Sequence, residues 1–315
     1  MVEVTVLGDI NVDLLTPPIR AYPKKDSQVL IPHLKMEVGG CAAHSALALA
    51  RLGVKARLIG LIGRDWFGKF LLEKLKEFRV DSKVKQAGRG KTGISFGISF
   101  KDGKRSLITF RGTNSLLSLK DFKLEAIGGE IFLLGGYNLL RNLEKDAGKI
   151  LKFAKKKGML TCLEPDLKSG INCNLRMLKK NLKLVDFFLP DFEEGKILTK
   201  ERNEVKIARK ILRFGCKHVV LKLDKKGCLI ASQKESFRIR AFKVRAVNPT
   251  GAGDFFNAGF IYGLLKYKSL RKAGILGNIA GAFAVTKFGE ERYIGKEEME
   301  KWLKKVRLEK FIEEV

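Results

Sequence analysis

Residues 246–260, Ala-Val-Asn-Pro-Thr-Gly-Ala-Gly-Asp-Phe-Phe-Asn-Ala-Gly-Phe, join an extended segment to a predicted helix that runs from Asp254 to about Lys266. Gly251 and Gly253 leave the backbone open, so successive N–H groups can face outward at the helix N-terminus. The helix dipole adds about half a positive charge there, which makes the turn a candidate anion site. Asp254 lies in the first helical turn, beside any phosphate that those amides bind. A base beside a bound phosphate is what phosphoryl transfer to a hydroxyl requires, whereas a plain capped turn is the simpler interpretation.

The composition fits a soluble α/β enzyme. The chain has 315 residues, 45% of them hydrophobic, and 32 glycines, which is enough for one large domain or two small ones. No apolar run is long enough to span a bilayer, so we expect no membrane contact. The N-terminal segment contains an acid and no basic region, which favours a strand over a signal peptide. The five cysteines are scattered without a C-x-x-C pair, which argues against disulfides and structural zinc and favours the cytoplasm.

The formal net charge of +28 is the extreme feature of the chain. Such a field attracts polyanions, nucleotides and phosphorylated ligands, so a nucleic-acid-binding protein without kinase activity is an alternative from a different class. However, the sequence has no basic block with interleaved aromatic residues and no zinc finger, so we expect no specific nucleic-acid partner. We attribute most of the charge to solvated helix faces.

The order of predicted elements is typical of a mostly parallel sheet with helices on both faces. From residue 130 onward, strands alternate with helices of about 10–15 residues, which predicts right-handed βαβ units. An Asp-Gly turn at 101–104 between two β-rich runs predicts a hairpin. We expect one domain, 1–315, with a small β appendage. The predicted strands are Val2–Gly8, Gln28–Ile31, Ala56–Leu61, Ile94–Phe100, Ser106–Phe110, Ile131–Leu134, Met159–Leu163, Phe187–Leu189, His218–Leu221, Gly227–Ala231 and Arg238–Val244. The predicted helices are Cys41–Leu52, Trp66–Phe78, Leu143–Lys157, Leu175–Leu182, Val205–Phe214, Asp254–Lys266, Ser269–Lys287 and Glu297–Val306.

Two glycine-rich segments resemble the signatures of the ribokinase-like (PfkB) carbohydrate kinases. Asn248-Pro-Thr-Gly-Ala-Gly-Asp254, followed by Asn257-Ala-Gly-Phe260, is similar to the C-terminal signature of that family. Gly39-Gly-Cys-Ala-Ala-His-Ser-Ala-Leu-Ala-Leu-Ala-Arg-Leu-Gly53 is similar to its N-terminal signature. The resemblance covers nearly the whole chain, because supporting segments follow in the family order. They are Gly8–Asp13, Gly60–Asp65 with Gly68, Arg111–Asn114, Leu189–Glu194 and Lys222–Gly227.

The resemblance implies a ribokinase-like three-layer sandwich with a small β lid, built from segments at about 14–37 and 90–113. It implies ATP-dependent phosphorylation of a sugar or sugar derivative, usually at a primary hydroxyl, with ATP and Mg²⁺ as cofactors. Asp254 would then be the general base, and the backbone of Gly251, Ala252 and Gly253 the anion hole for the γ-phosphate. Closing the lid would exclude water. Lids of this family often pair, so the resemblance also indicates a homodimer through the lid.

On the sugar side, the resemblance implies contacts from two strand residues and from the N-terminal signature. Asp13 would accept hydrogen bonds from two adjacent hydroxyls, with Asn11 as a weaker partner. Gly39 and Gly40 would let the sugar approach the backbone. The remaining candidates are His44, which stands where the family has Asn and which can hydrogen-bond or titrate near neutral pH, and Arg111 at the return of the lid. A turn residue at 13 and a merely packed histidine at 44 are the simpler interpretations.

On the nucleotide side, Asp191 and Glu194 occupy the positions of an Asn-x-x-Glu motif that the family associates with Mg²⁺ and phosphate. An acidic helix N-terminus is the alternative for that pair. The resemblance also implies nucleotide contacts from a strand and turn and from a later helix. These candidates are Lys222, Asp224 (where the family usually has Gly), Gly227, Asn278 and Ala282. Ordinary helix packing is the alternative for the last two.

Departures from the family pattern put ribose specificity in doubt. Besides His44, the chain has Gly135-Gly136-Tyr137 where several sugar kinases carry Glu or Gln, and Asn248 where Asp is usual. A nucleoside kinase of the same family is the nearest alternative, because its members share the same two glycine signatures. The basic charge also permits a sugar acid or a phosphorylated sugar. The sequence lacks the G-x-G-x-x-G turn of an NAD-dependent oxidoreductase and the G-x-x-x-x-G-K-[ST] loop of a P-loop kinase.

Overall fold

The main sheet of the computed structural model confirms the predicted parallel architecture. The structure describes residues 1–101, 105–168, 170 and 172–315. In this part of the chain ten strands form one sheet in the order β14-β13-β12-β11-β10-β9-β8-β1-β4-β5, and the seven strands from β11 to β5 are mutually parallel. The strands are β1 (Val4–Leu7), β4 (Ala56–Ile62), β5 (Asp81–Gln86), β8 (Ile131–Leu134), β9 (Leu160–Leu163), β10 (Phe187–Phe188), β11 (His218–Lys222), β12 (Cys228–Ala231), β13 (Ser236–Ile239) and β14 (Ile312–Glu314).

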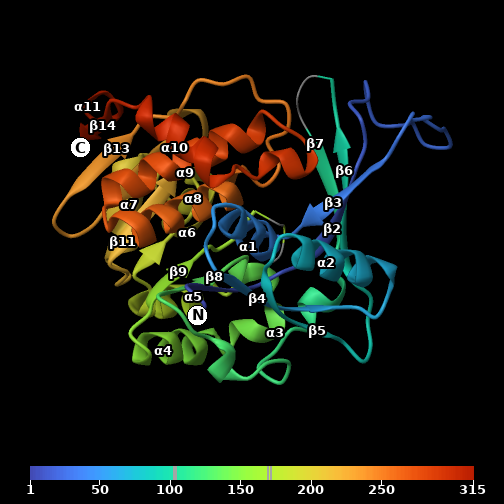
Figure 1. Cartoon of the computed structure of the whole chain (residues 1–315), viewed down its shortest axis with the longest axis horizontal. Helices are drawn as coiled ribbons and strands as arrows, with labels where there is room; N and C mark the ends of the chain where they lie inside the picture. Colours follow the sequence, from blue (N-terminus) through green and yellow to red (C-terminus); the bar gives the residue numbers. More distant parts are fainter. Residues whose placement is uncertain (102–104, 169, 171) are drawn as a thin grey trace.

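Helices cover both faces of this sheet (Figure 1), so the three-layer sandwich is confirmed. Alternate strand residues point to opposite faces. Leu133 belongs to the core that the sheet forms with α1, α2, α8, α9 and α10, whereas Leu134 belongs to the core formed with α4, α5, α6 and α7. The helices are α1 (Cys41–Arg51), α2 (Trp66–Glu77), α3 (Arg141–Glu144), α4 (Ala147–Lys156), α5 (Leu175–Asn181), α6 (Phe192–Thr199), α7 (Glu204–Leu212), α8 (Ala252–Tyr267), α9 (Leu270–Val285), α10 (Lys296–Lys304) and α11 (Leu308–Phe311).

A second, smaller sheet projects from the edge of the sandwich (Figure 1). Its order is β3 (Lys35–Gly39), β2 (Asn11–Leu15), β6 (Gly93–Ser99) and β7 (Arg105–Phe110). The predicted hairpin therefore forms, although its turn at 102–104 lies outside the described residues. The strand predicted at Gln28–Ile31 is wrong: this stretch is irregular, Leu30 is 84% exposed, and β2 pairs with residues 35–39 instead.

Other differences from the predicted elements have local causes. The strand predicted to reach Val244 ends at Ile239, because β14 pairs with β13 only over Phe237–Ile239. The helix predicted at 143–157 is two helices, α3 and α4, separated by Lys145 and Asp146. The strand β5 is missing from the predicted elements, because Val84 is its only apolar residue and four of its six residues are exposed. Among the described residues, no helix is long and apolar enough to cross a membrane.

The backbones of helices α8 and α9 lie in close contact, and this packing positions the glycine turn at the start of α8. Gly263 on α8 faces α9, and a Cβ at this position would lie 2.5 Å from the Cα of Ala273. Gly259, one turn earlier, faces the carbonyl oxygen of Leu276 in the same way. Small residues at these two positions therefore allow the close approach of the two helices.

We expect Gly263→Val to lower the free energy of unfolding by about 1–3 kcal/mol or more, because the added methyl groups have no space against α9. Chemical denaturation followed by circular dichroism measures this change. Gly88→Val is the matched control, because no atom lies within 4 Å of a Cβ at Gly88. Equal stability of the two variants would contradict the close packing of α8 on α9.

Candidate active site

A cleft of about 800 Å³ lies between the carboxyl ends of the parallel strands and the second sheet. Four strands deliver polar residues to it: Asp9 follows β1, Glu164 follows β9, Asp191 follows β10, and Lys222 ends β11. In doubly wound sheets ligands bind at this edge, because the side chains after neighbouring parallel strands converge there. Most of the residues predicted from the sequence line the cleft. They are Asn11, Asp13, Gly40, His44, Arg111, Asp191, Glu194, Lys222, Asp224, Gly251, Ala252, Gly253 and Asp254.

The turn before α8 has the backbone geometry expected of an anion site. Gly251 caps the helix with φ of +69°, in the left-handed region, and α8 begins at the next residue. The side-chain oxygen of Asn248 accepts a hydrogen bond from Thr250 N at 3.1 Å and orders the turn from within. A Cβ at Gly251 would lie 3.4 Å from Asp254 Oδ2 and 3.3 Å from His44 Cδ2, so these three residues are adjacent.

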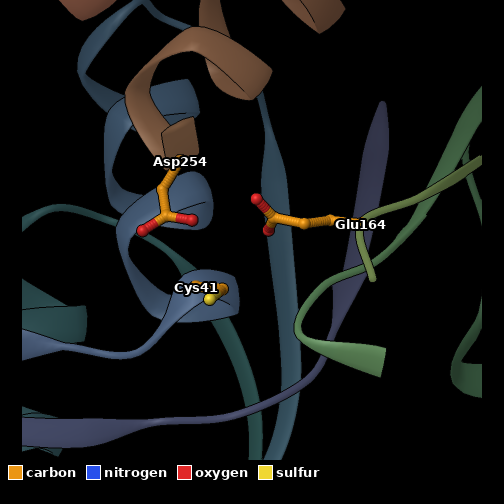
Figure 2. Close-up of side chains that lie close together, drawn as sticks. All are labelled: Cys41, Glu164 and Asp254. Carbon is orange, nitrogen blue, oxygen red and sulfur yellow. The ribbon is translucent and has the colours of Figure 1, made fainter. Parts of the chain in front are cut away.

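Asp254 belongs to a cluster of buried acidic groups. Figure 2 shows the carboxylates of Asp254, from the start of α8, and Glu164, from the end of β9, on either side of Cys41 at the start of α1. One ligand atom from each residue lies within 4.8 Å of the other two. Burial and the nearby Glu164 raise the pKa of Asp254 well above its usual range. Burial and the same carboxylates also raise the pKa of Cys41, so its thiol stays protonated.

Lys222 is the cation of this cluster. Its ammonium lies 3.0 Å from Glu164 Oε1 and 3.4 Å from Asn257 Oδ1, and a Cβ at Gly253 would be 3.2 Å from it. Burial alone would lower the pKa of Lys222, but Glu164 and Glu194 raise it above its ordinary value, so the side chain stays charged. A fixed positive charge thus lies beside the first turn of α8.

On the side of the second sheet, Asp13 and Asn11 lie on β2. Burial, together with Glu37 and Asp9, raises the pKa of Asp13 to about 7. Gly39 does not line the cleft, but a side chain there would overlap the carboxylate of Asp13. The side chain of Asn11 is hydrogen-bonded within the protein, because its Oδ1 accepts a hydrogen bond from Asn114 Nδ2 at 2.6 Å.

Asp9 has a structural role that the sequence did not reveal. Its Oδ1 accepts a hydrogen bond from Cys41 N at 3.1 Å, so it caps α1. Gly40 has φ of +96°, and a Cβ there would clash with the Asp9 carbonyl. Arg111 Nη1 lies 3.5 Å from Asp9 Oδ2 and so compensates its charge.

His44 is a neutral, buried histidine. Its Nδ1 is 2.9 Å from the hydroxyl of Tyr293, while its Nε2 has no partner among the described residues. Burial and the positive charges of Arg292 and Arg105 lower the pKa of His44 to about 3. The titration near neutral pH that the sequence allowed is therefore wrong, and His44 acts as a hydrogen-bonding group only.

The nucleotide-side candidates divide into two groups. Asp191 and Glu194 form a capping box at the start of α6, and Glu194 Oε1 also accepts from Leu167 N at 3.0 Å. Burial and Asp191 raise the pKa of Glu194 to about 7. The structure does not bring Gly227, Asn278 and Ala282 to the cleft. Asn278 instead donates to the carbonyls of Ile239 and Arg240, at 3.2 and 3.1 Å.

Sequence reasoning missed several residues that line the cleft. Glu164 and Asp166 directly follow β9, so the rule that polar residues at strand ends form ligand sites would have found them. Burial and Asp9 raise the pKa of Asp166 to about 6. No sequence signal pointed to the inward-facing residues of the second sheet. These are Ser95, Arg105, Leu107 and Thr109.

Two features indicate that the cleft is built for a ligand. Eight acidic but only four basic residues line it, so the excess of basic residues in the whole chain is not repeated in the cleft. Of the six buried side-chain N and O atoms without a partner in the described structure, three belong to cleft residues: His44 Nε2, Arg111 Nε and Glu164 Oε2. Unpaired buried polar atoms are costly, and a hydroxyl-rich ligand would satisfy them.

Residues 1–293 match the sequence profile of the pfkB family carbohydrate kinases. The chain belongs to this family. It is 30% identical over 300 residues to a ribokinase of Haemophilus influenzae, and the match covers 92% of this chain and 94% of the ribokinase. It is therefore a carbohydrate kinase.

Solved structures agree with this pfkB fold. A ribokinase of Thermotoga maritima superposes with a TM-score of 0.81 at 27% identity, over 96% of this chain and 100% of that one. An Escherichia coli protein, solved in complex with ATP and Mg²⁺, superposes with a TM-score of 0.84 at 23% identity, over 97% and 100% of the two chains.

The carboxyl of Asp13 provides a test of the electrostatics of the cleft. We expect ¹³C NMR of Asp-labelled protein to give a midpoint near pH 7 for Asp13, because burial and Glu37 raise its pKa. Glu37→Gln should lower this midpoint, since Glu37 lies directly across from Asp13 in the β2–β3 pair. Asp65 is the internal control: burial raises its pKa, but hydrogen bonds from Thr92 and Gly68 lower it overall. Equal midpoints for Asp13 and Asp65 would contradict the burial of Asp13 beside Glu37.

Proposed function

We propose that the protein transfers the γ-phosphoryl group of ATP to a primary hydroxyl of a sugar or sugar derivative. One observation carries the proposal: a single cleft brings together Asp254, the Gly251–Gly253 turn and Asp13. A base, an anion site and a carboxylate able to bind a diol are the three parts that phosphorylation of a polyol needs.

Asp254 is the general base, which takes the proton of the attacking hydroxyl. Its raised pKa suits this role, because a stronger base accepts the proton more readily as the oxygen attacks phosphorus. The amides of Gly251, Ala252 and Gly253 receive the charge that develops on the transferred group. Lys222, beside Gly253, adds a fixed positive charge to the same region.

Asp13 binds the sugar as an acceptor for two hydroxyls, with His44 Nε2 and Arg111 as further polar contacts. The acidic majority of the cleft favours a neutral, hydroxyl-rich substrate over a sugar acid or a phosphorylated sugar. It also disfavours nucleic acid as the occupant of this cleft.

ATP enters the cleft from the side of Asp191, Lys222 and Asp224, and needs Mg²⁺ to approach an acidic surface. The donor set fits this ion, because Mg²⁺ prefers carboxylate oxygens, and Asp191 and Glu194 supply them. An Escherichia coli protein of the same fold was solved with ATP and Mg²⁺, which supports this pair of ligands for the cleft but assigns no residues. When bound, the ion neutralises phosphate charge. Because both carboxylates also belong to the capping box of α6, they would hold the ion with the lone pairs that these hydrogen bonds leave free.

The second sheet acts as a lid over the sugar. Its residues Ser95, Arg105 and Thr109 face the cleft, so a movement of this sheet would close the sugar side against water.

A nucleoside kinase would use the same catalytic groups. An ATP-coupled assay over pentoses, hexoses, sugar acids, inositols and nucleosides separates these substrates, and turnover on none of them would overturn the proposal.

We expect Asp254→Asn to lower kcat by about 10²–10⁴-fold, because the amide cannot accept the hydroxyl proton. Calorimetry should show sugar binding within about twofold of wild type, since Asp13 and not Asp254 binds the diol. In the wild type, kcat/KM should fall as the pH is lowered through the raised pKa of Asp254, which must be ionised to act. Asp146→Asn, a substitution outside the cleft, serves as control. A normal kcat in Asp254→Asn would exclude this residue as the base.

The outer edge of the lid is apolar. β7 is an edge strand, and Ile108 and Phe110, on the face opposite Leu107 and Thr109, are 65% and 55% exposed. We expect a homodimer through this edge, because exposed apolar edge strands pair with a partner. Light scattering after size exclusion should give the dimer mass for the wild type and the monomer mass for Ile108→Asp. A monomeric wild type at about 100 µM would contradict this pairing.

A further inference from the structure

Arg292 is a fully buried arginine that forms no ion pair with a carboxylate of the described residues. It ends the short 3₁₀ helix Gly289–Arg292, is 1% exposed, and is among the largest fully buried side chains of the protein. No carboxylate of the described residues lies within 4.0 Å of its guanidinium. Burying a guanidinium is costly, and an arginine cannot lose its charge to escape that cost. Specific interactions must therefore compensate the cost of burying Arg292.

Arg292 donates hydrogen bonds to two backbone carbonyls, one directly before the Gly251–Gly253 turn and one at the end of α9. Nη2 donates to the carbonyl of Thr250, the residue directly before the Gly251–Gly253 turn. Nε donates to the carbonyl of Ala284 at 3.3 Å, in the last turn of α9, where the helix dipole favours a cation. The guanidinium also lies 4.8 Å from the ring centre of Phe255, the residue after Asp254. All three contacts thus bracket the start of α8.

The charge of Arg292 also reaches the carboxylates of the cleft. Its electrostatic partners include Glu37, Asp254 and Asp13. Arg292 is itself absent from the residues that line the cleft, so it does not contact the substrate. It therefore acts from behind the anion site and through the backbone.

We propose that Arg292 is a positioning residue that serves as a built-in cation of the anion site. It fixes the Thr250 carbonyl, and with it the direction of the Gly251–Gly253 amides, and it adds a buried positive charge behind the point where negative charge develops. This inference rests on the proposed phosphoryl transfer. A purely structural clamp between α9 and the turn is the competing interpretation.

Two variants separate these interpretations. Arg292→Ala opens a cavity lined by the Thr250 and Ala284 carbonyls, whereas Arg292→Met fills the same space with an apolar side chain that a buried site tolerates well. We expect both to lower kcat by about 10²-fold, the loss typical of one anion-hole group, with the KM for the sugar within about threefold of wild type. A structural clamp would instead lower the melting temperature without this division between kcat and KM.

Chemical rescue supplies the decisive readout. Guanidinium chloride at about 50 mM, far below denaturing concentrations, should raise the kcat of Arg292→Ala at least about tenfold, because the free ion can occupy the cavity and donate to both carbonyls. It should leave Arg292→Met unchanged, since no cavity is left there. Tetramethylammonium chloride at equal concentration, which has no N–H donors, should rescue neither variant.

Arg245→Ala is the matched control, because this arginine lies in the segment that leads into the Gly251–Gly253 turn but is exposed. Wild-type turnover is established first with the substrate found in the screen, so that its absence overturns the proposed function and not the role of Arg292. A wild-type kcat in Arg292→Met, or no rescue of a folded Arg292→Ala, would overturn the inference. Should Arg292→Ala not fold, the kcat and KM of Arg292→Met decide.

Discussion

The buried ion pair between Lys222 and Glu164 is the interaction on which the cleft depends. Parallel strands end at one edge of the sheet, so the groups that follow β1, β9 and β10 bring several carboxylates into a small volume. Without a cation among them, their mutual repulsion and desolvation would oppose folding. Lys222, as the last residue of β11, places one charge 3.0 Å from Glu164 and close to Gly253. Stability of the cleft and charge for phosphoryl transfer therefore come from the same side chain.

The second constraint is the placement of positive charge on both sides of one turn. Lys222 lies on the cleft side of the turn before α8, and Arg292 lies behind it, held by backbone carbonyls. Neither charge is part of the glycine-rich signature. The signature provides open amides, and the surrounding fold provides the field in which those amides act. Burial, together with the positive charges of Arg292 and Arg105, keeps His44 neutral, so the sugar side of the cleft presents a hydrogen-bonding group rather than a charge.

Much of the fold could be predicted because its signals are local. The βαβ alternation from residue 130 onward and the hydrophobic runs of β8 and β11 depend only on neighbouring residues, and both strands form as expected. Predictions failed where the pairing between strands determines which segment becomes a strand. Gln28–Ile31 has strand composition, but Lys35–Gly39 pairs with β2. In the site, the spacing of the glycines was enough to predict Asp254 and the turn before it. Asn278 was predicted as a nucleotide contact from its position in the chain, but its side chain donates to the backbone carbonyls of residues 239 and 240.

The sequence by itself determined the family, the three-layer architecture and the turn at residues 251–254, because each depends on residue types at fixed spacing. The tertiary structure alone decided which charges meet. Asp9 caps α1, Glu164 pairs with Lys222, and Arg292 reaches Thr250 across 42 residues of chain. Such contacts follow from where strands end and how helices pack, and the pKa of a carboxyl follows from its burial and its neighbours. No local pattern encodes either, so the acidic cleft inside a chain of charge +28 becomes visible only in the folded protein.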